Sequence, residues 1–169
     1  VIGAPEGPTI PGYVLGVAAR GGEGAEYATG CHGSRHVLYH PAAMELMDRR
    51  VIRAVEDAYH LGISPDAGAV LIVELDGQPE GLAREGARVA EILRANRAFG
   101  VDIAETPERR EALWQGRKKS TGALGRLAPA YATHDIVVPR TRLPEMAARI
   151  RDMERRYGIR IGFVAHAGD

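Results

Sequence analysis

Cysteine is almost absent from this sequence of 169 residues: Cys31 is the single example, so no internal disulfide can form. No apolar run approaches the ~18 residues that a membrane-spanning helix needs. Basic and acidic residues number 22 each, which leaves no net positive field to attract nucleic acid or anionic lipid. Aromatic residues make up only 5%, and the best predicted strand has no stacking pair, which disfavours RNA binding. These absences favour a cytoplasmic protein with no transmembrane segment and no nucleic-acid partner.

Glycine and proline are concentrated near the N-terminus. Residues 1–40 contain 9 Gly, 3 Pro and only five charged residues, a composition typical of loops, whereas periodic apolar patterns begin after residue 40. We therefore divide the sequence into a loop-rich segment, 1–40, and a folded domain, 41–169. Because the sequence begins with Val1 and stops inside a motif, we expect a fragment that is truncated at both ends.

Strand and helix patterns alternate through residues 41–169. Ala69–Val73 is apolar on both alternating faces and is followed by Asp76-Gly77, which is typical of a central strand closed by a turn. The patterns predict helices at about 48–60, 79–97, 107–119 and 143–157, and strands at about 69–73, 101–104, 131–138 and 159–166. This order predicts an α+β fold, in which helices pack on one face of a mainly antiparallel sheet.

The predicted helix at 107–119 carries the first candidate ligand-binding residues. Trp114, Arg117 and Thr121 are spaced i, i+3 and i+7, so they share one side of the helix if it continues to residue 121. The planar fork of an arginine suits a carboxylate, so Arg117 with the Thr121 hydroxyl would bind a small organic acid. The alternative is that the cations here only complement the helix dipole and stay in water. Spacing alone leaves both interpretations open.

Histidines supply the other candidates. His166 ends the last predicted strand on the face that holds Gly162, where a missing side chain leaves room for another group. A neutral imidazole is a common metal ligand, although a structural, hydrogen-bonded histidine is the alternative. Residues 31–40 contain four further candidate zinc ligands, Cys31, His32, His36 and His40. Because that segment lacks a spaced cysteine pair and a core pattern, we favour a solvated loop there.

Six separated motifs follow one another along residues 41–169. They are Pro41-Ala42-Ala43-Met44-Glu45-Leu46-Met47-Asp48, Leu71-Ile72-Val73-Glu74-Leu75-Asp76-Gly77, Trp114 with Arg117, Leu124-Gly125-Arg126, Asp135-Ile136-Val137-Val138-Pro139-Arg140 with Leu143-Pro144, and His166-Ala167-Gly168-Asp169. Together they resemble the C-terminal cap domain of FAD-linked 2-hydroxy-acid oxidoreductases, the family that contains the flavin subunit of glycolate oxidase and D-lactate dehydrogenase. Six motifs in order are more specific than any one of them.

The resemblance implies a cap of ferredoxin-like α/β units, which closes the substrate site over FAD held by a separate domain. Arg117 corresponds to the carboxylate-binding arginine of the family and Thr121 to a substrate-contacting position. His166 corresponds to the first of two histidines that bind a divalent metal, Zn or Mn, in some members. The second histidine and the base of the family lie beyond Asp169, so we expect no catalytic residue within this sequence.

Residues 11–30 resemble the end of the family's FAD domain, with Gly22, Glu23 and Gly24 in a loop that approaches the cofactor. We therefore interpret residues 1–40 as a remnant of that domain. Because most of the flavin-binding fold is missing, we expect the isolated chain to have no turnover and no tight FAD binding.

The implied function is that of a fragment of an FAD-dependent enzyme that oxidises a small 2-hydroxy acid, such as glycolate or D-lactate, to the 2-oxo acid. Thr133 replaces a lysine of the 2-hydroxyglutarate branch, which favours a small acid. The implied partner is an iron–sulfur electron-transfer subunit, through which a cytoplasmic protein would sit at the inner face of the membrane. The alternative function is a non-enzymatic ferredoxin-like module for ligand binding or protein association.

Overall fold

The computed structural model of the chain describes residues 13–19, 41–64, 66–77 and 79–167. These residues form a five-stranded sheet in the order β4-β1-β3-β2-β5, with every pair of neighbours antiparallel. The strands are β1 Tyr13–Ala19, β2 Ala43–Asp48, β3 Ala69–Leu75, β4 Gly100–Ala104 and β5 Val164–His166. The order 4-1-3-2 of the first four strands is the ferredoxin-like arrangement. The predicted α+β class with an antiparallel sheet is therefore confirmed.

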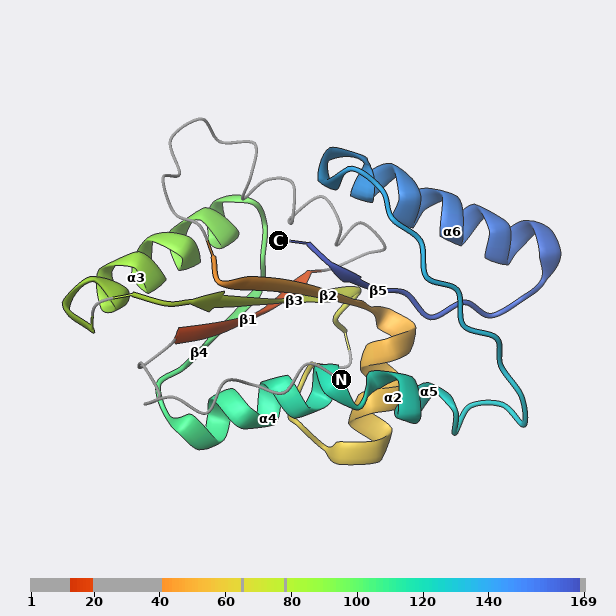
Figure 1. Cartoon of the computed structure of the whole chain (residues 1–169), viewed down its shortest axis with the longest axis horizontal. Helices are drawn as coiled ribbons and strands as arrows, with labels where there is room; N and C mark the ends of the chain where they lie inside the picture. The colour runs from red at the N-terminus through yellow and green to blue at the C-terminus, as the bar shows by residue number, and fades with distance from the viewer. Residues whose placement is uncertain (1–12, 20–40, 65, 78, 168–169) are drawn as a thin grey trace.

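Helices cover both faces of the sheet, with α3 and α6 on one side and α2, α4 and α5 on the other (Figure 1). Their bounds are α2 Arg49–Tyr59, α3 Pro79–Ala95, α4 Pro107–Lys118, α5 Ser120–Leu124, the 3-10 helix η1 Arg140–Arg142 and α6 Leu143–Tyr157. The predicted single helical face is corrected to two. Leu71 and Val73 of β3 join the core under α3 and α6, whereas Val70 and Ile72 join the core under α2, α4 and α5. A strand that is apolar on both sides needs a helical layer over each.

The predicted helix ends are present in the structure. The Asp48 side chain accepts a hydrogen bond of 2.9 Å from the Val51 amide at the start of α2, and His60 ends that helix in the left-handed conformation. Thr106 caps α4 in the same way. Gly158, with φ +64, ends α6. None of the described helices is both long enough and apolar enough to cross a membrane.

Two predicted strands differ from the structure. Residues 131–138 form no strand, and Val137 is fully exposed. No strand in the described part of the chain pairs with this segment, so its alternating apolar side chains have no sheet to bury them. The last predicted strand is confined to Val164–His166, because these are the residues that pair with β2.

The sequence patterns give no strand at β1 or β2, yet both lie in the sheet. β1 pairs with β3 on one side and β4 on the other, so the expectation of a loop is corrected for residues 13–19. The sequence pattern does not predict β2, because Glu45 interrupts the apolar residues of this strand. The interpretation of residues 1–40 as a remnant of an FAD domain stays a prediction.

Candidate functional site

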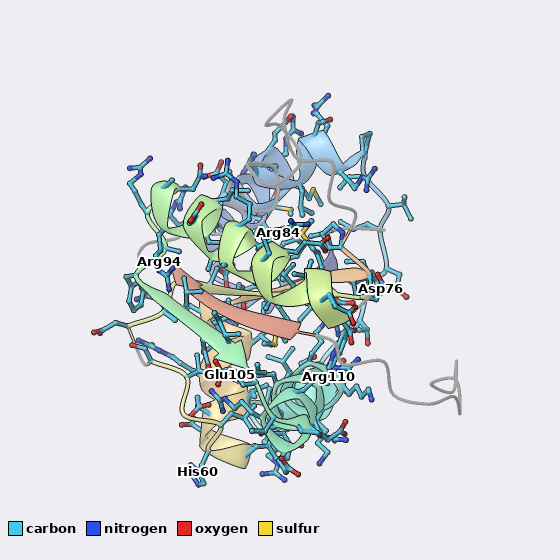
Figure 2. The ribbon with its side chains drawn as sticks, turned by 90° about the vertical axis from the view of Figure 1, so that its left-hand side faces the viewer. His60, Asp76, Arg84, Arg94, Glu105 and Arg110 are labelled. Atoms are coloured by element: carbon cyan, nitrogen blue, oxygen red, sulfur yellow. The ribbon has the colours of Figure 1, made fainter. Side chains whose placement is uncertain are left out.

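Helix α4 is fixed across one face of the sheet by three arginine–carboxylate pairs among the described residues. From its start to its end, the pairs are Arg109 with Asp102 on β4, Arg110 with Glu74 on β3, and Arg117 with Glu45 on β2. Arg110 is labelled in Figure 2, on the side of the sheet that α4 covers. Each pair reaches a different strand, so α4 cannot slide or rotate without breaking them. The position of Arg117 is therefore set by the sheet.

Glu45 is the buried centre of the site. The residue is only 4% exposed, and its two carboxylate oxygens have different partners. Oε2 accepts a hydrogen bond of 2.8 Å from Arg117 Nε, and Oε1 lies 2.6 Å from His166 Nδ1. The Arg117 side chain is 17% exposed, whereas the His166 side chain is 69% exposed. A carboxylate at this depth is destabilising unless its charge and lone pairs are met, and these two side chains meet both oxygens.

The register of the sheet explains why these groups meet. Glu45 is directly opposite His166 in the β2–β5 pair and directly opposite Ile72 in the β2–β3 pair. Directly opposite residues point to the same face of a sheet. Ile72 belongs to the core under α2, α4 and α5, so this is the face that α4 covers. An edge strand and a helix therefore deliver an imidazole and a guanidinium to one carboxylate.

Of the predicted ligand-binding residues, the structure brings Arg117 and His166 together through Glu45. Thr121 is on α5, beyond Lys119, where α4 has ended, and its side chain is exposed. Among the described residues, no hydrogen bond or ion pair joins Thr121 to Arg117 or His166. Trp114 packs against the core on the same face of the sheet. The assignment of Arg117 and Thr121 to a substrate stays a prediction.

The space at Gly162 is taken by the protein itself. A Cβ atom there would lie 2.9 Å from Leu124 Cδ2 and 3.2 Å from Val51 Cγ2. The expected room for another group is therefore filled by side chains of α5 and α2. We conclude that Gly162 allows side chains of α5 and α2 to pack closely against the segment before β5.

The sequence did not predict a role for Glu45, although this residue is part of the family motif at residues 41–48. The available signal was an acidic residue between apolar ones, since Met44, Leu46 and Met47 are all buried. Acidic residues are almost never fully buried without a partner. A lone acidic residue inside an apolar strand therefore indicates a specific ion pair, although it does not say with which element.

The cofactor and metal predictions are largely beyond the described residues. Gly22, Glu23 and Gly24 lie outside them, as do the candidate zinc ligands of residues 31–40. Within the described part of the chain, no three His, Cys, Asp or Glu side chains are placed to hold a metal ion. His166 and Glu45 supply two such groups, fewer than the three or four protein ligands of a typical zinc site. Metal binding by His166 stays a prediction, and these residues alone do not form a metal centre.

Asp48, the last residue of β2, is a carboxyl with a raised pKa. Burial raises the pKa of Asp48 from 3.8 to about 6, and the negative charge of Glu154 acts in the same direction. Hydrogen bonds from backbone amides and the nearby Arg50 oppose this rise. Because this carboxyl caps α2, a change in its protonation changes the free energy of unfolding of the chain.

Comparisons with known proteins place these motifs in a family. The family described as FAD linked oxidases, C-terminal domain, matches residues 31–169. Glycolate oxidase subunit GlcD of Escherichia coli (strain K12) is 38% identical over 129 residues, which are 76% of this chain and 26% of that protein. The GlcD subunit of Bacillus subtilis (strain 168) is 34% identical over 129 residues, 76% of this chain and 27% of that protein.

A third relative, the mitochondrial D-lactate dehydrogenase (cytochrome) of Arabidopsis thaliana, is 30% identical over 130 residues, 75% of this chain and 22% of that protein. The chain spans about a quarter of the length of these curated relatives. The family match, in contrast, covers most of the chain and includes Glu45, Arg117 and His166. The resemblance seen in the sequence is therefore confirmed, and the chain belongs to the C-terminal domain family of the FAD-linked oxidases.

Proposed function

We propose that the chain is the cap portion of a flavin-dependent oxidoreductase that converts a small 2-hydroxy acid, such as glycolate or D-lactate, to the 2-oxo acid. The names of the relatives support this substrate class, since glycolate and D-lactate are both small 2-hydroxy acids. The observation that carries the proposal is that Glu45 holds Arg117 and His166 at one place on the sheet. A guanidinium beside an imidazole is suited to the carboxylate and the hydroxyl of such an acid.

In this proposal Arg117 binds the substrate carboxylate. Its Nε donates to Glu45, so the ligand would be bound through the two terminal nitrogens, in the two-pronged manner that suits a carboxylate. His166 would accept a hydrogen bond from the 2-hydroxyl through the ring nitrogen that faces away from Glu45. Thr121, four residues beyond Arg117 and on α5, would add a hydroxyl contact. When bound, FAD would supply the acceptor for the hydride that leaves the α-carbon, while a general base takes the proton of the 2-hydroxyl. Gly22, Glu23 and Gly24 are our proposed contacts with the cofactor.

Glycolate binding to the full 169-residue chain tests the proposal. Titration followed by two-dimensional ¹H–¹⁵N NMR detects millimolar affinities, and saturable shifts are expected around Arg117. The Arg117→Lys variant should bind glycolate about tenfold more weakly, because an ammonium group lacks the paired donors of a guanidinium.

Arg110→Lys is the matched control, because Arg110 lies on the same helix and pairs with Glu74 on the neighbouring strand. Its glycolate affinity should equal that of the wild type. An affinity that Arg117→Lys leaves unchanged, or equal losses in the two variants, would remove Arg117 from the binding site and contradict the proposal.

We extend the proposal to the setting of the whole protein. Electrons would pass to an iron–sulfur electron-transfer subunit, and a cytoplasmic flavoprotein would be held at the inner face of the membrane through that subunit. The support is that two relatives are named as subunits of glycolate oxidase. Co-purification of an iron–sulfur protein with the whole flavoprotein is the expected result.

One observation favours the second candidate, a protein-association module. Residues 127–139 have no regular secondary structure, and four of their large apolar side chains are exposed, those of Leu127, Tyr131, Ile136 and Val137. Exposed apolar groups gathered on one segment are typical of association surfaces. A ferredoxin-like fold serves such a role as well as it serves a catalytic cap.

A further inference from the structure

Glu45 is placed to do more than neutralise one arginine. We propose that Glu45 is a positioning residue that fixes His166 as its Nδ1–H tautomer while it holds Arg117 against the sheet. Both side chains then face one ligand, with a donor at one end and an acceptor at the other. The benefit to a ligand rests on the proposed function, whereas the tautomer follows from the geometry of this chain alone.

The tautomer follows from the donors and acceptors in the contact. His166 Nδ1 lies 2.6 Å from Glu45 Oε1, a hydrogen-bond distance. An ionised carboxylate only accepts hydrogen bonds, so the proton of this bond has to be on Nδ1. In a neutral imidazole the second nitrogen, Nε2, then carries the lone pair. His166, whose side chain is 69% exposed, therefore presents an acceptor away from Glu45.

The second oxygen of Glu45 is used in a different way. Oε2 accepts from Arg117 Nε at 2.8 Å, and a guanidinium has no acceptor form, so this contact always needs an oxygen. The two oxygens thus serve donors from two elements, α4 and β5. Because Glu45 is 4% exposed, water is a poor substitute for either partner.

Glu74 provides a comparison within the same molecule. It lies on the neighbouring strand β3, pairs with Arg110 of the same helix, and has a side chain that is 15% exposed. Among the described residues, its ion pair involves an arginine and no histidine. If the only role of Glu45 were an ion pair between the sheet and α4, Glu45→Gln and Glu74→Gln should have the same effect on the tautomer of His166.

Glu45→Gln should reverse the tautomer of His166. The new side chain has one oxygen that accepts and an NH₂ group that only donates, so it no longer offers an acceptor at both of the positions that Oε1 and Oε2 of Glu45 occupy. Arg117 can only donate, which keeps the amide oxygen on its side. The NH₂ group then faces Nδ1, which has to become the acceptor, and the ring proton moves to Nε2.

Long-range ¹H–¹⁵N NMR of the histidine rings, recorded on the 169-residue chain, distinguishes the two tautomers directly. A pH of about 8.5 keeps ordinary histidines neutral. The His166 signals are identified by their loss in His166→Gln. We expect Nδ1–H in the wild type, Nε2–H in Glu45→Gln, and Nδ1–H in the matched control Glu74→Gln.

An Nε2–H tautomer in the wild type overturns the inference, and this result does not depend on any variant folding. The same tautomer in Glu45→Gln and Glu74→Gln also overturns it. The exposed rings of His60 and His134 serve as internal references, because free imidazoles of histidine prefer Nε2–H. A tautomer switch without glycolate binding contradicts the proposed function alone, whereas glycolate binding that depends on Arg117 without the switch contradicts this inference alone.

Discussion

The two acidic side chains of β2, Glu45 and Asp48, differ in the side chains that surround their charge. Glu45 has a partner for each of its oxygens, whereas Asp48 is half-buried near Glu154, and the pKa of Asp48 rises from 3.8 to about 6. Asp48 nevertheless caps α2 through the Val51 amide. Near neutral pH the folded chain therefore keeps a charge that its surroundings disfavour.

The contribution of Asp48 to the stability of the chain should fall as the pH rises between about 4 and about 6. In this range folded Asp48 binds more protons than unfolded Asp48, so the free energy of unfolding decreases with pH, and the contribution is lost above about 6. At about 1.4 kcal/mol per pKa unit, the loss is about 3 kcal/mol at most. Asp48→Asn keeps a capping oxygen and should lack this slope.

Urea unfolding of the wild type and Asp48→Asn at several pH values across that range measures the difference. Subtracting the two curves cancels the titration of all other groups. Parallel curves would show that Asp48 titrates alike in the folded and unfolded chain.

Individual residues show which part of the site could be predicted. Asp48, Thr106 and Gly158 act on atoms within a few residues of themselves, so their capping roles are visible in the sequence. The partners of Glu45 come from α4 and β5, and only the register of the folded sheet brings them together. Local patterns carry no information on that register.

At the scale of elements, α2, α5 and the segment before β5 meet at Gly162. The absence of a side chain there lets Leu124 and Val51 approach the backbone.

The sequence pattern did not predict two strands, β1 and β2, and the reason also lies at the scale of elements. A strand is stabilised by its neighbours in the sheet, and those of β1 are β3 and β4, which come much later in the sequence.

Gly162→Ala should destabilise the chain by about 1–3 kcal/mol, because the added methyl group would overlap the side chain of Leu124. Gly122→Ala is the matched control. Gly122 lies on α5, and a Cβ atom there would have no neighbour within 4 Å, so alanine should leave stability unchanged or raise it slightly. Thermal unfolding followed by circular dichroism compares the variants. Equal melting temperatures for the two would refute close packing at Gly162.

At the scale of the whole molecule, the sheet and its two helical layers bury most large apolar side chains, but residues 127–139 leave several exposed. The α+β class was predictable, because it depends on the order of helix and strand patterns. The second helical layer and the lack of a strand at residues 131–138 depend on which surfaces meet, which the order of elements does not determine.

The exposed apolar segment should cause the isolated chain to self-associate at high concentration. Light scattering after gel filtration, over a range of loading concentrations, should show a mass that rises with concentration. Val137→Asp should suppress this rise, because Val137 is fully exposed and a charge there disfavours apolar contact. Thr133→Asp adds the same charge to an exposed polar position of the segment and should have a smaller effect. A constant monomer mass for the wild type at every concentration would count against the association candidate.

The carboxylate shared by α4 and β5 couples the motions of these two elements. A fluctuation that lifts the helix from the sheet withdraws Arg117 and also loosens the support of the His166 ring, since both depend on Glu45. β5 has three residues and, within the described part of the chain, pairs with β2 alone, so few backbone hydrogen bonds of the sheet restrain it there. The Arg117 guanidinium and the His166 imidazole should consequently be ordered together and lose their positions together.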